Sequence, residues 1–211
     1  MREAQGIVGE LLWVSQRTRL DICFATHKCA SFSTRDPKWT IKVGKQILRY
    51  LVGTKGLGLR YTTQEGLSSV VDELTAVVDL VVYPAPYEVN SMIGSSDASF
   101  APENNNTKSV GAFVIFYAGG VVFWKTFKQT IDAESTCEAE LVSACETQKA
   151  VNSVATLVND LRDPIEVPVY KALADDNTAA ISLAKNKSQV HWRTRHLKVR
   201  ADALLDAVNT G

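Results

Sequence analysis

Apolar residues in the first sixty positions recur every three or four residues, which is the spacing of one face of an α-helix. Three helices are expected, and the apolar positions of the first are Ile7, Leu11, Leu12 and Val14. The second helix is expected over residues 20–32, and the third after Asp36-Pro37, an N-cap residue followed by the residue favoured at the first helical position. Gly53 is expected to end the third helix, and residues 56–61 are expected to form a short strand.

Residues 92–127 change to short apolar runs that are typical of β-strands. Strands are expected over residues 92–98, 110–117 and 121–127. Ala118-Gly119-Gly120 predicts a tight hairpin turn between the last two, because glycine supplies the positive φ that such turns require. The block is therefore expected to contain three antiparallel strands.

The rest of the chain alternates helical and strand patterns. A long helix is expected over residues 132–161, a fourth strand over 167–173, a short helix over 178–184 and a last helix over 194–208. The order β-β-β-α-β-α-α predicts an α/β domain in which helices cover the sheet.

Residues 62–91 are expected to separate the two regions. This segment is acidic, has two prolines near its end and contains one candidate strand at 77–82, so we expect a linker or an atypical hairpin. The predicted organisation is a helical segment at 1–61, an acidic linker at 62–91 and an α/β domain at 92–211.

Charge is unevenly distributed although the net charge is zero. Residues 1–60 hold eleven Lys and Arg against four Asp and Glu, residues 61–107 hold none against seven, and residues 108–211 hold twelve against twelve. A basic front suits an anionic partner such as nucleic acid, but charge alone favours the interpretation that these residues form solvated helix faces.

No apolar run has the length of a membrane span, and no secretion signal precedes the first helix, so we expect a cytoplasmic or nuclear protein that is not secreted and does not contact a membrane. The four cysteines are expected to be reduced and buried. Cys23, His27 and Cys29 lie close in sequence, but without a fourth ligand they are a poor zinc site.

Three carboxylates occur where a metal site built on a sheet would need them. Asp97 lies in the first strand, Glu140 in the first half of the long helix, and Asp176 directly after the fourth strand. Each alone has an ordinary explanation as a turn residue, a solvated helix residue or a helix cap. Glu138 is the alternative to Glu140 and points to a different face of the helix, and Glu140 is preferred because two apolar residues follow it.

Taken together, the order strand-Asp, hairpin, helix-Glu, strand-Asp resembles the ribonuclease H fold, and longer strings resemble its version in copia-type retrotransposon polyproteins. The resemblance implies an α/β fold with a mixed sheet, three strands antiparallel and the fourth parallel, and flanking helices. The strings are Ser-Asp-Ala at 96–98, the hairpin 108–129, Ser-Thr-Cys-Glu-Ala-Glu at 135–140, Asp-Asn at 176–177, Ala-Ile-Ser-Leu-Ala-Lys-Asn at 180–186 and Arg-Thr-Arg-His-Leu-Lys-Val-Arg at 193–200. The family has Cys-Asp-Asn at the fourth strand. Residues 6–13, 19–25 and 48–59 are similar to the segment that joins the reverse transcriptase to this domain.

The resemblance implies an endonuclease that hydrolyses the RNA strand of RNA–DNA hybrids, with the reverse transcriptase polymerase domain of the same polyprotein as its neighbour. It implies that Asp97, Glu140 and Asp176 are the catalytic residues and hold Mg²⁺, with two ions expected and Mn²⁺ able to substitute. Mg²⁺ is a hard cation that prefers oxygen ligands, and paired ions about 3.5–4 Å apart assist phosphodiester hydrolysis.

A basic stretch with one aromatic residue follows the short helix. As phosphate contacts for the hybrid we consider Lys185, Lys187, Trp192, Arg193, Arg195, Lys198 and Arg200. A solvated loop and helix face is the equally good alternative interpretation.

The resemblance also implies a fourth carboxylate beyond the last helix. Because the sequence stops at Gly211, the domain is expected to be C-terminally truncated. A catalytically inactive remnant that at most binds nucleic acid is therefore the alternative to an active nuclease. A different nuclease or an integrase of the same fold is a third possibility, since a fold does not fix a function. Convergence of Asp97, Glu140 and Asp176 on one point would favour the nuclease over the remnant.

Overall fold

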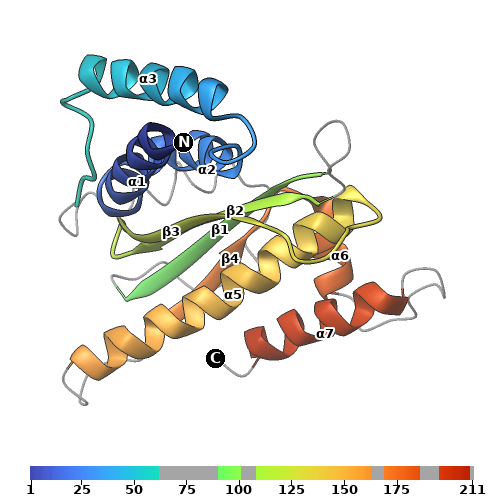
Figure 1. Ribbon diagram of the computed structural model, residues 1–211. Helices are drawn as coiled ribbons and strands as arrows, with labels where there is room; N and C mark the ends of the chain where they lie inside the picture. Colours follow the sequence, from blue (N-terminus) through green and yellow to red (C-terminus); the bar gives the residue numbers. More distant parts are fainter. Residues whose placement is uncertain (62–89, 101–107, 163–168, 186–194, 210–211) are drawn as a thin grey trace. The chain divides into compact units, whose positions relative to one another are not determined.

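The computed structural model describes residues 1–61, 90–100, 108–162, 169–185 and 195–209 (Figure 1). The chain divides into two compact units, one formed by residues 1–60 with 124–127 and the other by residues 61–123 with 128–211. Most of the expected linker at 62–91, including the candidate strand at 77–82, lies outside the described residues. None of the described helices is both long enough and apolar enough to cross a membrane.

The first unit is helical, as the apolar spacing predicts. Its elements are α1 (Arg2–Arg17), the 3-10 turn η1 (Leu20–Ile22), α2 (Cys23–Ser31) and α3 (Pro37–Gly53). The expected second helix thus begins with one 3-10 turn before the α-helix. The carboxylate of Asp36 accepts a hydrogen bond from the backbone N–H of Trp39 at 3.0 Å and caps α3.

The helices of this unit pack around a small apolar core. Its buried members are Val8, Leu11, Ile22, Cys29 and Ile47. Helices α1 and α3 approach closely at Gly44, where a Cβ would lie 2.5 Å from Cγ2 of Ile7. The buried Arg19 donates to both carboxylate oxygens of Asp21 and to the backbone carbonyl of Thr54, which ties η1 to the end of α3.

The second unit is built on a four-stranded mixed sheet. Its strands are β1 (Ser91–Ser99), β2 (Val110–Tyr117), β3 (Gly120–Lys128) and β4 (Tyr170–Ala174), in the spatial order β3-β2-β1-β4. Strand β1 pairs antiparallel with β2 and parallel with β4. The prediction of three antiparallel strands and a parallel fourth is confirmed, and the arrangement is compatible with an RNase H-like fold.

The hairpin between β2 and β3 differs from the expected turn in one residue. Ala118 has φ 48° and Gly119 has φ 76°, while Gly120 already belongs to β3. Positive φ at both central residues is the conformation that a two-residue hairpin needs to match the strand twist. The turn therefore places an alanine, and not a second glycine, in the left-handed region.

The described residues of this unit also form the helices α5 (Thr136–Leu161), α6 (Thr178–Lys185) and α7 (Arg195–Asn209). Helix α5 runs along one face of the sheet, and α7 lies beside it (Figure 1). Helix α5 begins after Ser135, later than expected, because the Ser135 hydroxyl caps it by accepting a hydrogen bond from the backbone N–H of Glu138 at 3.1 Å. Helix α5 approaches β1 at Gly94, where a Cβ would lie 2.7 Å from side-chain methyls of Thr147 and Val151.

The prediction of a short strand at residues 56–61 is wrong. Helix α3 is followed by a turn in which the N–H of Leu57 donates to the carbonyl of Thr54 at 3.0 Å, and residues 57–61 adopt no regular structure. Alternating apolar residues form a strand only when a neighbouring strand pairs with them. Here Tyr61 instead donates its hydroxyl to the Val121 carbonyl at 3.1 Å.

Candidate metal centre

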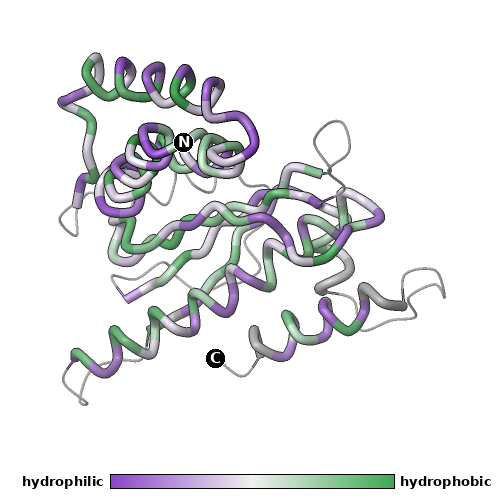
Figure 2. The backbone as a smooth tube through the Cα atoms, viewed as in Figure 1, coloured by the Kyte–Doolittle hydropathy of each residue, from purple (hydrophilic) through white to green (hydrophobic). Residues whose placement is uncertain are grey.

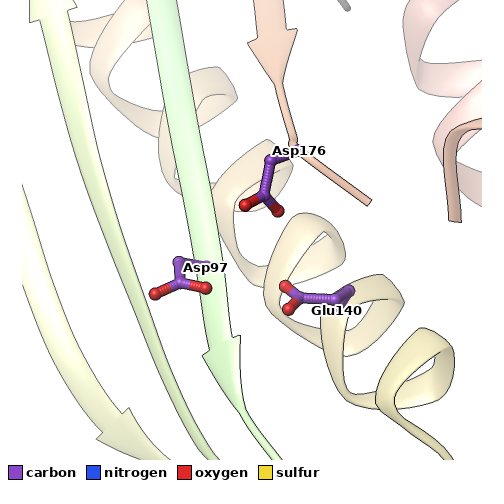
Figure 3. A group of neighbouring side chains, drawn as sticks. All are labelled: Asp97, Glu140 and Asp176. Carbon is purple, nitrogen blue, oxygen red and sulfur yellow. The ribbon is translucent and has the colours of Figure 1, made fainter. Parts of the chain in front are cut away.

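The three predicted carboxylates come together at one end of the sheet. Asp97 projects from β1, Glu140 from the second turn of α5 and Asp176 from the residues just after β4 (Figure 3). Each offers one oxygen, and these oxygens all lie within 4.8 Å of one another. The parallel register of β1 and β4, in which Ser95 pairs with Ala174, carries both strands to this point together.

Buried polar contacts fix the start of α5 against the sheet. The hydroxyl of Ser143 donates to the backbone carbonyl of Asp97 at 3.0 Å and contacts that of Ala112 at 3.3 Å. The side-chain amide of Gln129, just beyond β3, donates to the Ala139 carbonyl at 2.8 Å. Glu140 lies between these two anchor points on the helix, so its position relative to Asp97 is set by the packing.

Glu140 is buried in a way that disfavours a negative charge. Its relative exposure is 7%, and its Oε2 has no hydrogen-bond partner among the described residues. Its pKa is raised to about 8, first by burial and then by the charges of Asp175, Asp97 and Asp176, while a hydrogen bond from the Ala98 backbone opposes the shift. The carboxylate therefore needs a cation or a proton at neutral pH.

Asp175 is a fourth acid beside this group that the sequence does not single out. It is 6% exposed, and its carboxylate accepts from the Ser96 hydroxyl at 3.1 Å and from the Asn177 backbone at 2.9 Å. Burial raises its pKa to about 6, against the lowering effect of these two hydrogen bonds. The only signal in the sequence is that Asp175 stands where the resembled string has cysteine.

Glu138 has a structural role instead. Its carboxylate pairs with the guanidinium of Arg200 at 3.1 Å and accepts the backbone N–H of Glu134 at 2.8 Å. These bonds connect the start of α5 to α7. Of the two glutamates considered from the sequence, Glu140 is thus the one that faces Asp97 and Asp176.

The donor set fits a hard divalent cation. All three groups offer carboxylate oxygens, one of them buried and without a partner, and Mg²⁺ binds such oxygens at about 2.0–2.1 Å. A cation at the centre would satisfy Glu140 and offset the repulsion among the carboxylates. Among the described residues this is the one group of three or more potential ligands, and Cys23 and Cys29 are free thiols.

The residues considered as phosphate contacts are only partly described. Lys187, Trp192 and Arg193 lie outside the described residues, and only the backbone is described for Lys185 and Arg195. Lys198 is partly buried on α7, and Arg200 is engaged by Glu138.

Comparison with known proteins shows that the chain is similar to parts of transposon polyproteins. It is 30% identical over 194 residues to the retrovirus-related Pol polyprotein from transposon TNT 1-94 of Nicotiana tabacum, a match that covers 92% of this chain. It is 25% identical over 209 residues to that from transposon RE1 of Arabidopsis thaliana, covering 99%. The homologues of this chain are retrovirus-related Pol polyproteins.

The likeness extends to fungi but covers a small part of each relative. Transposon Ty1-NL2 Gag-Pol polyprotein of Saccharomyces cerevisiae is 28% identical over 120 residues, or 57% of this chain and 7% of that polyprotein. The chain spans 12% of the length of each of the two plant polyproteins. No protein-family model matches the chain. No solved structure matches it either.

Proposed function

We propose that this chain is the RNase H-like part of a copia-type Pol polyprotein and that it is a Mg²⁺-dependent endonuclease for the RNA strand of RNA–DNA hybrids. Its proposed catalytic residues and metal ligands are Asp97, Glu140 and Asp176. Its proposed neighbour is the reverse transcriptase polymerase domain of the same polyprotein, in the cytoplasm or nucleus. The homology to Pol polyproteins and the mixed sheet support this proposal.

The observation that carries the proposal is the convergence of three carboxylates from separate elements around a buried oxygen without a partner. Helix capping, turn formation or solvation explains each acid alone, but none explains why one of them is buried beside two others. A buried charge without a partner is costly, so such a cluster persists where it binds a cation. The remnant interpretation gives no reason for the group to stay together.

The chain's own side chains have distinct parts in this chemistry. Asp97 and Asp176 are exposed and accessible to a phosphate backbone, whereas Glu140 forms the buried floor of the group. When bound, Mg²⁺ supplies positive charge that neutralises the carboxylates and polarises the phosphate ester. Ser143 and Gln129 keep Glu140 in place through α5, and Ser96 and Asp175 join the ends of β1 and β4.

Substrate binding in this proposal uses the basic stretch after α6. The residues concerned are Lys185, Lys187, Trp192, Arg193, Arg195, Lys198 and Arg200. Phosphate contacts position a nucleic acid without reading its sequence, which suits an enzyme that acts on any hybrid. The guanidinium of Arg200 is already paired with Glu138, so its share in phosphate binding is expected to be the smallest.

The test is cleavage of a hybrid labelled separately on its RNA and DNA strands, with purified protein and with or without Mg²⁺. We expect Mg²⁺-dependent cutting of the RNA strand alone, and at least about a hundredfold loss in Asp97→Asn, since removal of a principal charge-stabilising group has that effect. Glu146→Gln is the matched control, because it removes one acid from the same helix as Glu140 where it pairs only with Lys149.

Three outcomes separate the interpretations. Cutting that Asp97→Asn abolishes and Glu146→Gln retains supports the nuclease. Hybrid binding without any cutting in Mg²⁺ or Mn²⁺ supports the inactive remnant. Cutting of both strands contradicts the proposed specificity for RNA and favours another nuclease of this fold.

A further inference from the structure

Helix α3 carries a row of four positive side chains on one face. They are Lys38, Lys42, Lys45 and Arg49, and all four are exposed. At about 100° of rotation per residue, the four positions lie within about 60° of one another around the helix axis, over a length of about 16 Å. We call these four residues the α3 basic row.

The opposite face of α3 is the one that packs. Its buried residues are Thr40, Gly44 and Ile47, and Gly44 touches Ile7 of α1. Figure 2 shows hydrophilic and hydrophobic positions alternating along this helix. The basic row is thus directed away from the core of the helical unit.

An ordinary solvated helix face does not account for the row. Such a face mixes charges of both signs, whereas α3 contains no Asp or Glu, and none of the four cations has an ion-pair partner among the described residues. Like charges three and four residues apart repel, and Lys38 lies in the first turn of the helix, where its dipole disfavours cations. The row lowers the stability of its own helix, which points to a use in binding.

We propose that the α3 basic row binds the phosphate backbone of a nucleic acid duplex, as a second contact surface separate from the carboxylate group and from the basic stretch after α6. A straight line of charges on a rigid helix matches a regular line of phosphates. An acidic protein surface presents its charges irregularly and would also be expected to contact apolar residues. No residue of the row is part of the proposed nuclease chemistry.

The test is binding of the full chain to a labelled RNA–DNA hybrid by fluorescence anisotropy at several salt concentrations, with a chelator present so that no cleavage occurs. One variant changes all four residues of the row to Gln. The matched control also removes four exposed cations of the helical unit, by Arg2→Gln, Arg17→Gln, Lys28→Gln and Lys55→Gln. Each phosphate contact contributes about 0.9 to the slope of log affinity against log salt.

We expect the row variant to bind at least about tenfold more weakly and its salt slope to fall by about 3.6, which is about 0.9 for each of four contacts, while the control changes the slope by less than about 1. The row variant should melt at the same or a higher temperature than the parent, which rules out misfolding as the cause of weak binding. Equal effects of the two variants on binding would overturn the proposal. A row variant that binds the hybrid normally but no longer binds polyglutamate would overturn it too, in favour of an acidic protein partner.

A parallel cleavage assay of the parent and the row variant in Mg²⁺, without chelator, separates this inference from the proposed function. A parent that binds through the row but never cuts in Mg²⁺ supports this inference and contradicts the nuclease. A parent that cuts, with a row variant that binds and cuts equally well, contradicts this inference alone.

Discussion

At the scale of single residues, Glu140 combines deep burial with no cationic partner among the described residues. Because its pKa rises to about 8 from the ordinary value of 4.5, the folded protein holds this proton more tightly than the unfolded chain does. The resulting stabilisation is fully present below the unfolded pKa and is lost as pH rises through the folded pKa. The pKa of Asp175 is also raised, to about 6, so the stabilisation that its proton contributes is lost as pH rises through about 6.

The metal-free protein should therefore lose stability between pH 6 and pH 8 mainly because of Glu140. In chelator, we expect the free energy of unfolding of the parent to fall by about 2 kcal/mol over this interval relative to Glu140→Gln. The variant has no proton to lose and gains no buried charge, so it should be the more stable protein at pH 8. Urea denaturation at both pH values measures this difference, and parallel pH dependences in the two proteins would contradict it.

Ala118 is a second residue whose conformation has a measurable cost. Its φ of 48° lies in the left-handed region, which alanine adopts less readily than glycine does. We expect Ala118→Gly to raise the free energy of unfolding by about 0.5–1 kcal/mol and Ala118→Val to lower it by about 1 kcal/mol or more. Thermal melting of the two variants beside the parent tests both signs, and a loss of stability in the glycine variant would refute the turn assignment.

At the scale of elements, the sequence predicts what depends on local pattern and misses what depends on neighbours. Apolar periodicity places all the described helices and strands, and Asp36 places the start of α3. Residues 56–61 were expected to be a strand because local alternation does not reveal whether a pairing partner exists. The start of α5 moves to Ser135 because capping, and not propensity, decides where a helix begins.

The carboxylate group shows the same division. The element types and their order predict that Asp97, Glu140 and Asp176 form one group. The burial of Glu140 and the Ser96–Asp175 hydrogen bond, however, depend on how α5 lies against the sheet. The close contact between α5 and β1 is made possible by Gly94, and from the sequence alone a glycine in a strand indicates only a weaker strand. Nothing local to β1 indicates that a helix crosses it there.

Gly94→Ala should accordingly weaken the contact between β1 and α5. The added Cβ would meet methyl groups of Thr147 and Val151 at 2.7 Å, and overpacking of this kind costs about 1–3 kcal/mol. Gly9→Ala in α1 is the matched control, because a Cβ there meets nothing within 4 Å and alanine is the better helix former. Urea denaturation should show destabilisation in the first variant and none in the second, and equal effects would mean that the contact is not close.

At the scale of the whole molecule, the zero net charge conceals an uneven distribution of basic and acidic residues along the chain. Residues 1–60 carry eleven basic against four acidic residues and include the α3 basic row, whereas the second unit contains the carboxylate group. In our two proposals, a polyanionic ligand and a divalent cation thus have separate complementary surfaces in one chain. Each ligand should stabilise the unit that binds it, because binding to the folded state alone shifts the unfolding equilibrium.

Mg²⁺ should for this reason raise the melting temperature only of the unfolding transition that includes residues 61–123 and 128–211. A free concentration of one hundred times the dissociation constant corresponds to about 2.7 kcal/mol. The increase should be larger at pH 8 than at pH 6, because protons compete with the cation for Glu140. Differential scanning calorimetry of the parent, Asp176→Asn and Glu146→Gln measures it. The shift should disappear in Asp176→Asn and persist in Glu146→Gln, whereas an equal shift in all three proteins would place the cation elsewhere on the chain.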